Sequence, residues 1–112
     1  MKYIEKQIED EQTGAIAGYH EITLLKCDYL NKIVETTMAS YASKKAKDNG
    51  KNALSFNTFT FTNAMPDTGE SAHDWSLNQL IQPKPEDFVP ENYVGYVNPY
   101  IFAGGKIKET NA

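Results

Sequence analysis

An Asp-Thr-Gly tripeptide at residues 67–69 is the first place where this sequence suggests chemistry. Aspartic proteases hold a pair of aspartates that share one proton, each on such a loop, and a homodimer would supply the second loop. Here the tripeptide follows Met65-Pro66 instead of a hydrophobic strand, and Glu70-Ser71 comes next. We therefore interpret it as a turn, closed by an Asx-type hydrogen bond, that precedes a helix.

Four residues of metal-ligating type lie close together: Asp67, Glu70, His73 and Asp74. On a helix, the last three would lie on neighbouring turns of one face, where they would bind a hard cation weakly. Their spacing matches no established ligand pattern, and acidic residues near a helix start are already explained by the helix macrodipole. We therefore predict no metal site.

The other reactive residue types are isolated. His20 lies in the middle of a predicted strand, where histidine is more often a hydrogen-bonded sheet residue than a base. Neither Cys27 nor any serine has a recognisable nucleophile setting, and the sequence has no glycine-rich phosphate-binding loop. We therefore predict that the protein is not an enzyme and binds no cofactor.

The length and charge indicate one domain over residues 1–112. A chain of 112 residues with a net charge of -4 has room for one modest core, and a domain of this size buries about two-thirds of its unfolded surface. The single cysteine has no partner in the chain, so no internal disulfide supports the fold. A reducing compartment at synthesis is the simpler interpretation.

The basic residues argue against a nucleic-acid partner. All 11 are lysine, so the bidentate contacts that arginine makes to guanine or phosphate are absent. We interpret the cluster of Lys44, Lys45 and Lys47, with Lys51 nearby, as the solvated face of a helix in a net acidic protein. The chain start lacks the apolar stretch of a signal peptide, and no run approaches the roughly 20 apolar residues that span a bilayer. We therefore predict no membrane association.

Residues 2–62 predict a β core of four strands, at 2–10, 15–27, 32–41 and 53–62, with a turn at 11–14. In the first strand, Ile4 and Ile8 share one face. The second strand is apolar on both faces, so we expect it to be central or covered by another chain. One of its faces carries Ile16, His20, Ile22 and Leu24. The third alternates and is rich in β-branched residues, with Val34, Thr36, Met38 and Ser40 on one face.

The fourth predicted strand changes its pattern midway. Leu54 and Phe56 fall on one face, whereas Phe59 and Phe61 fall on the other. This switch at Asn57-Thr58 predicts either a β-bulge or a strand that is buried on different faces at its two ends.

Two short helices complete the expected elements. Ser43 is placed to cap a connector helix through residue 48, which Asn49-Gly50 would end. Within the loop and short helix expected at 63–82, Ser71 or Thr68 would cap a helix over residues 72–81. Overall we expect a mainly β protein: a small antiparallel sheet or sandwich with one or two short helices and a proline- and aromatic-rich C-terminal arm.

That arm, residues 83–112, is the predicted interface. It combines prolines and glycines with aromatic residues, and a short hairpin at Gly104-Gly105 would pair residues 100–103 with 106–108. Rings of this kind are favoured at protein interfaces, although they also close cores. The candidate interface residues are Phe88, Tyr93, Tyr96, Tyr100 and Phe102.

The first half of the chain carries a resemblance. Glu9-Asp10-Glu11-Gln12-Thr13-Gly14 leads into a strand with Tyr19-His20, a threonine-rich strand ends at Ala39-Ser40-Tyr41, and the lysine-rich stretch 43–51 follows. In this strand-and-turn texture, residues 2–62 resemble small uncharacterised proteins of tailed bacteriophages and prophages. Such proteins tend to be encoded among virion structural genes, often near tail components. The resemblance implies a non-enzymatic virion protein and transfers no functional residues.

We therefore expect a structural virion protein of the tail or baseplate region, synthesised in the cytoplasm of the bacterial host. It would act by assembly with other virion proteins, as a homo-oligomer or in multiple copies. Two alternatives stay open. A capsid decoration or head-completion protein would have the same sequence character, and a glycan- or host-surface-binding module would use the tyrosine and tryptophan rings for its ligand.

Overall fold

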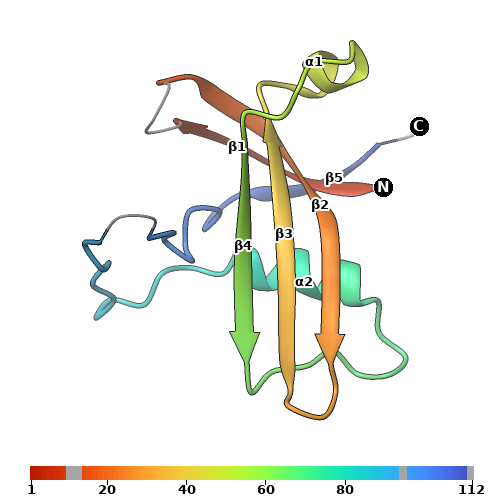
Figure 1. The fold of residues 1–112 in the computed structure, drawn as a ribbon, viewed down its shortest axis with the longest axis vertical. Helices are drawn as coiled ribbons and strands as arrows, with labels where there is room; N and C mark the ends of the chain where they lie inside the picture. Colours follow the sequence, from red (N-terminus) through yellow and green to blue (C-terminus); the bar gives the residue numbers. More distant parts are fainter. Residues whose placement is uncertain (10–13, 94–95, 111–112) are drawn as a thin grey trace.

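Five antiparallel strands form a single sheet in the order β4-β3-β2-β1-β5 (Figure 1). The computed structural model describes residues 1–9, 14–93 and 96–110, and residues 11–13 of the predicted 11–14 turn lie outside them. The mainly β class with two short helices is confirmed, as one sheet and not a sandwich. In chain order the elements are β1 (Lys2–Glu9), β2 (Ile16–Asp28), β3 (Ile33–Tyr41), α1 (Lys44–Asp48), β4 (Ser55–Thr62), α2 (Ala72–Leu80) and β5 (Lys106–Glu109).

The middle strand, β3, follows its predicted alternation. Val34, Thr36, Met38 and Ser40 are all buried on the face that α2 covers. Val34 and Thr36 are branched at Cβ and suit this pleated environment, in which β3 pairs with β2 on one side and with β4 on the other. The period-2 pattern was sufficient here because β3 has no register shift against β4.

A bulge in β2 changes the predicted assignment of its faces. Ile22 lies opposite Met38, and the next paired residue is Leu24, opposite Thr37, so Thr23 is the extra residue. An extra residue moves every later side chain to the other face. Leu24 is consequently 64% exposed, whereas Ile22 is buried and Leu25 packs against the core. The prediction that Ile22 and Leu24 share a face is therefore wrong.

The bulge predicted at Asn57-Thr58 in β4 is also wrong. β4 pairs with β3 without interruption from Ser55 to Thr62. Phe59 is buried and Phe61 is half-buried against Trp75, but Phe56 lies on the opposite face and is 64% exposed. The change of pattern in the sequence thus marks an exposed aromatic residue, not a change of register.

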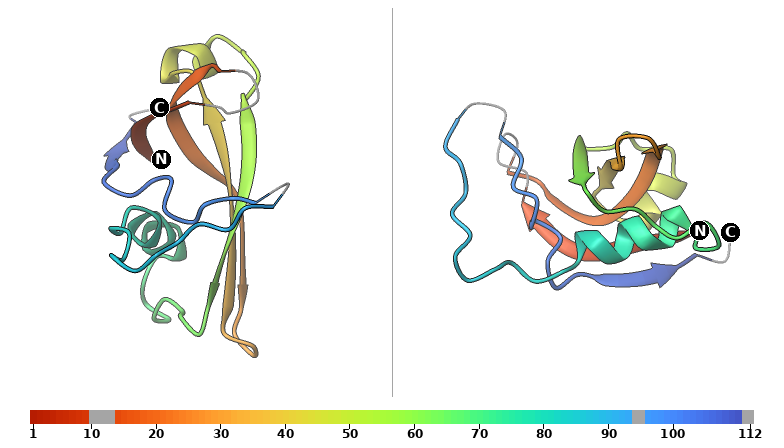
Figure 2. Two further views of the ribbon diagram at one scale, coloured as in Figure 1. Left: turned by 90° about the vertical axis from the view of Figure 1, so that its left-hand side faces the viewer. Right: turned by 90° about the horizontal axis from the view of Figure 1, so that it is seen from below.

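Helix α2 covers one face of the sheet (Figure 2). The Ser71 hydroxyl caps it by accepting a hydrogen bond from the Asp74 backbone N–H at 3.2 Å, so Ser71 and not Thr68 is the cap. Leu77 and Leu80 enter the core beside Ile4, Ile22, Met38, Phe59 and Phe102. Helix α1 likewise begins after the predicted cap Ser43, and Gly50 adopts a φ of 79° beyond its end.

The C-terminal residues belong to the fold, and the predicted hairpin at Gly104-Gly105 is wrong. Residues 106–109 form β5, which pairs with β1 so that Ile107 lies opposite Ile4. The Lys6 ammonium group donates to the carbonyl oxygens of Ile101 (2.7 Å) and Ala103 (2.9 Å). The expected arm over 83–112 therefore returns to the sheet before its end.

The core assignment predicts different costs for two phenylalanines of β4. Phe59→Ala should lower the free energy of unfolding by about 3–5 kcal/mol, because its ring is buried 5.5 Å from that of Phe102. Phe56→Ala is the matched control and should change it by about 0.5 kcal/mol or less, because that ring is on the surface. Urea unfolding followed by circular dichroism measures both, and equal midpoints would contradict the assignment.

Candidate functional site

The predicted interface residues do not form one surface. The Phe88 and Tyr100 rings are half-buried against each other, with centroids 4.7 Å apart, and Tyr93 and Tyr96 form a second pair at 5.3 Å. Tyr93 is exposed. Of these four, only Tyr96 and Tyr100 line the groove described below.

Phe102 must be removed from the predicted interface. It is completely buried, with its ring edge-on to His20 at 4.9 Å and to Phe59 at 5.5 Å. An aromatic residue in a stretch rich in glycine and proline gives no local sign of burial, because the core that covers Phe102 comes from strands far away in the sequence. Phe102 is therefore an anchor of the C-terminal segment and not a contact for a partner.

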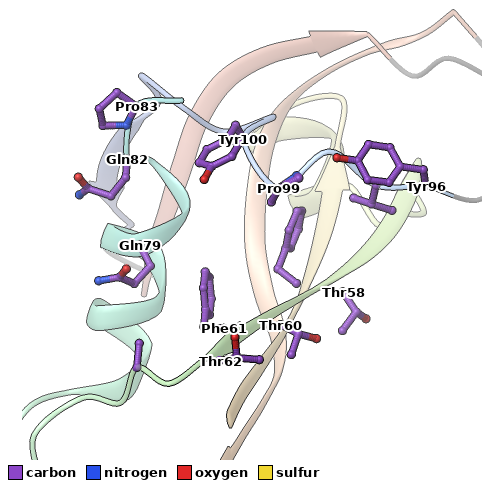
Figure 3. A pocket seen from close by; sticks show the side chains of 13 residues that line it. Thr58, Thr60, Phe61, Thr62, Gln79, Gln82, Pro83, Tyr96, Pro99 and Tyr100 are labelled. Atoms are coloured by element: carbon purple, nitrogen blue, oxygen red, sulfur yellow. The ribbon is translucent and has the colours of Figure 1, made fainter. Parts of the chain in front are cut away.

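A groove of about 630 Å³ runs beside β4, between that strand, the end of α2 and residues 96–100 (Figure 3). Phe61 and Tyr100 lie between the helix and the strand, with Gln79 and Gln82 on the α2 side. The β4 side is formed by Thr58, Thr60 and Thr62. None of the lining residues is charged, so the groove offers rings, hydroxyl groups and amides.

The β4 strand is one edge of the sheet, and the groove lies between this edge and residues 96–100. The Asn63 N–H donates to the Lys32 carbonyl at 2.9 Å, which marks a hydrogen-bonded pair across β3 and β4. Such pairs recur at every second residue of an antiparallel ladder. Phe59 and Phe61 therefore face β3 with their backbone groups, whereas Thr58, Thr60 and Thr62 direct theirs away from the sheet.

These outward N–H and C=O groups have no hydrogen-bond partner among the residues that the structure describes. A strand rises about 3.3 Å per residue, and the backbone groups of every second residue point to the same side. The outward groups therefore repeat about every 6.6 Å along the edge. Sequence reasoning missed this set of threonines. The alternation of threonine with phenylalanine predicted a strand, but nothing local shows that the strand is an edge.

The two edges of the sheet differ in their protection. β5 is short and carries Lys106, Lys108 and Glu109, with an ion pair of 3.2 Å between Lys108 and Glu5 of β1. Short, charged edge strands of this kind resist pairing with other chains. β4 is longer, Ser-Phe-Asn-Thr-Phe-Thr-Phe-Thr, and contains neither charge nor proline. Of the two outermost strands in the described part of the chain, β4 is thus the better suited to receive another strand.

The carboxylates among the predicted catalytic and metal-binding candidates make structural contacts. Asp67 lies in a turn in which its carbonyl accepts from the Glu70 N–H at 2.9 Å. The Asp74 carboxylate pairs with Lys2 at 3.1 Å. Among the described residues, no group of three or more histidine, cysteine, aspartate or glutamate side chains is placed to hold a metal ion.

His20 and Ser40 form a hydrogen-bonded pair in the core. Nε2–H of His20 donates to the Lys6 carbonyl at 2.8 Å, because that oxygen can only accept, and Nδ1 accepts from the Ser40 hydroxyl at 2.7 Å. Burial lowers the pKa of His20, and the nearby Lys6 charge acts in the same direction. Both side chains are almost completely buried, so a substrate has no access to this serine–histidine pair.

A second buried polar cluster fastens α1 to the other face of the sheet. The buried Glu21 carboxylate accepts from the Tyr19 hydroxyl at 3.0 Å and from the Lys47 ammonium group. Lys47 also lies over the rings of Tyr19 and Tyr41, at 5.5 and 5.9 Å. Burial, with the Glu21 carboxylate second, raises the pKa of Tyr19. Lys47 is therefore not part of a solvated face, which corrects that interpretation for this residue.

Comparison of the chain with protein-family models, with curated proteins and with solved structures finds no match. In the part of the chain that the structure describes, no helix is long and apolar enough to cross a bilayer. The open β4 edge with its groove is therefore the candidate site, on the evidence of this chain's own geometry.

The His20 environment predicts a loss of stability in mild acid. Because burial lowers the pKa of His20 in the fold, the unfolded chain binds a proton at this residue at a higher pH than the folded chain does, as the pH falls below the ordinary histidine pKa of 6.5. The free energy of unfolding should then fall by up to about 1.4 kcal/mol per pH unit and should be unaffected by this group above that pKa.

Urea unfolding of the wild type and of His20→Gln between about pH 5 and 6.5 measures this effect. His73 and the carboxylates are common to both chains, so the difference between the two slopes isolates His20. Parallel slopes would contradict the lowered pKa of His20.

Proposed function

We propose that this chain is a non-enzymatic structural protein that joins a larger assembly by pairing its β4 edge with a strand of another protein chain. The observation that carries this proposal is the open, uncharged β4 edge beside the groove. Strand addition supplies backbone hydrogen bonds for affinity and uses pockets beside the edge for alternate side chains.

The position of the groove supports strand addition. A further strand beside β4 would point every second side chain toward the face that α2 covers. Those side chains would lie beside Phe61 and Tyr100, in the groove, and their neighbours would lie next to the threonine side chains of β4. The open backbone and the groove thus fit the two requirements of one added strand.

The assembly proposed is a bacteriophage virion, in the tail or baseplate region, with the protein present in several copies. The resemblance of residues 2–62 to proteins of tailed bacteriophages supports this setting. A capsid decoration or head-completion protein would use the same edge, and its position in the particle would distinguish the two roles.

A glycan-binding module is the second candidate. The observation that favours it is the uncharged groove lining, in which the rings of Tyr96 and Tyr100 accompany the amides of Gln79 and Gln82. Sugars stack on rings and hydrogen-bond to amides, but binding of a sugar does not require a regular row of outward backbone groups. Strand addition accounts for both features of the site and is therefore preferred.

A proline at the centre of the edge tests the proposal. Thr60→Pro removes an N–H that faces away from β3, so the sheet keeps its own hydrogen bonds and circular dichroism should be close to that of the wild type. In particles purified from the producing host, this variant should be depleted about tenfold or more, the effect of about 1.4 kcal/mol. Thr60→Val keeps the N–H and the shape, and should be incorporated normally.

Two results would contradict the proposal in separate ways. Absence of the wild-type chain from purified particles would contradict the virion setting. Wild-type amounts of a correctly folded Thr60→Pro chain in those particles would contradict the role of the β4 edge.

A further inference from the structure

The far wall of the groove limits what can bind beside β4. Residues 83–93 and 96–100 lie on the side of β4 that faces away from β3 (Figure 1 and Figure 2). A strand that belongs to a sheet has a further strand along its other edge, and here residues 96–100 stand in that place. The groove therefore has room for one extended segment and not for the edge of a second sheet.

The lining of the groove sets the length and character of that segment. Residues 58–62 of β4 line it and extend over about 13 Å, so about five residues of an added strand would pair with them. None of the lining residues is charged, so a charged side chain buried there would find no ionic partner. The segment that fits is therefore uncharged where it pairs with β4.

An acidic stretch follows α2 along the same wall. Glu86, Asp87 and Glu91 are exposed, and Lys84 is the only basic residue among residues 84–91. None of the three carboxylates forms an ion pair with a residue that the structure describes. This stretch therefore carries a surplus of negative charge that the described residues do not neutralise.

Two ring pairs hold the acidic stretch beside the groove. Phe88 packs on Tyr100 and Tyr93 packs on Tyr96, with ring centroids 4.7 and 5.3 Å apart. Tyr96 and Tyr100 both line the groove, and residues 86–87 directly precede Phe88. Charges so near act on a bound segment, because screening at physiological ionic strength has a length of about 8 Å. A segment that leaves the groove thus enters a region of negative potential.

We propose that the strand bound at β4 is a free extended segment of a different protein, uncharged over about five residues and flanked by lysine or arginine. This inference rests on the proposed function and names the chemistry of its partner. The uncharged residues pair with β4 inside the groove, and the basic residues lie against residues 84–91. Backbone pairing supplies the affinity of such a segment, and the complementary charge selects it among other extended segments.

Fluorescence anisotropy with two labelled peptides tests the role of charge. Both peptides have the centre Val-Thr-Val-Thr-Val, and one carries two lysines and the other two glutamates at each end. At low ionic strength the full-length chain should bind the lysine peptide at least about tenfold more tightly than the glutamate peptide. In about 0.5 M sodium chloride this preference should fall below about twofold, because salt screens the charges.

A charge variant separates the acidic stretch from the net charge of the whole chain. Glu86→Gln/Asp87→Asn should lower the preference for the lysine peptide by about threefold or more. Glu9→Gln/Glu109→Gln is the matched control, because it removes the same charge from β1 and β5, and it should leave the preference within about 1.5-fold of that of the wild type. All four carboxylates are on exposed residues, so both variants should fold normally.

A methylated peptide separates this inference from the proposed function. With its valines in the groove, the lysine peptide places its threonines opposite those of β4, where their N–H groups point to the β4 backbone. N-methylation of both peptide threonines should therefore weaken binding by about tenfold or more. Unchanged binding of the methylated peptide would contradict the strand pairing of the proposed function.

The inference about the partner would be overturned by equal binding of the two peptides, by no binding of the lysine peptide, or by an unchanged preference in the Glu86→Gln/Asp87→Asn chain. A chain that sediments as a dimer until the lysine peptide dissociates it would also overturn it, because a second copy would then be the occupant. If the two peptides bind equally and N-methylation still weakens binding, the proposed function stands with a partner of different charge.

Discussion

Half of the backbone hydrogen-bonding groups of an edge strand point away from the sheet, where the sheet itself supplies no partner for them. At one edge lies β5, a short and charged strand that disfavours pairing with a further strand. At the other edge β4 presents Thr58, Thr60 and Thr62 with no such protection. An unprotected edge of this kind promotes aggregation of an isolated chain, whereas in an assembly protein it can bind a strand of a partner.

The core holds that edge in a fixed position. Phe59 and Phe61 point inward from β4, against Phe102 and Trp75, so the strand cannot turn its threonines inward without removing two aromatic rings from their packing. Phe102 is in turn held by the segment that Lys6 binds through two carbonyl oxygens. The C-terminal residues therefore form one side of the groove because the same segment completes the core.

The sequence predicted the elements well where the signals are local. Caps at Ser43 and Ser71 and the alternation of β3 were correct, because capping and period-2 burial are decided within a few residues. The bulge in β2, the pairing of β5 with β1 and the burial of Phe102 were missed, because each depends on a distant strand. The candidate site was missed for the same reason: which strand is an edge is a property of the topology, and β4 has no local pattern that shows it.

Amide hydrogen exchange, followed by NMR residue by residue, tests the open edge most directly. In the dissociated chain, the amides of Thr58, Thr60 and Thr62 should exchange fast, whereas those of Phe59 and Phe61 should be protected by their bonds to β3. On assembly the three threonine amides should become protected as well, which removes the alternation. Protection of all five amides in the dissociated chain would contradict the account, because the β4 edge would then already be occupied.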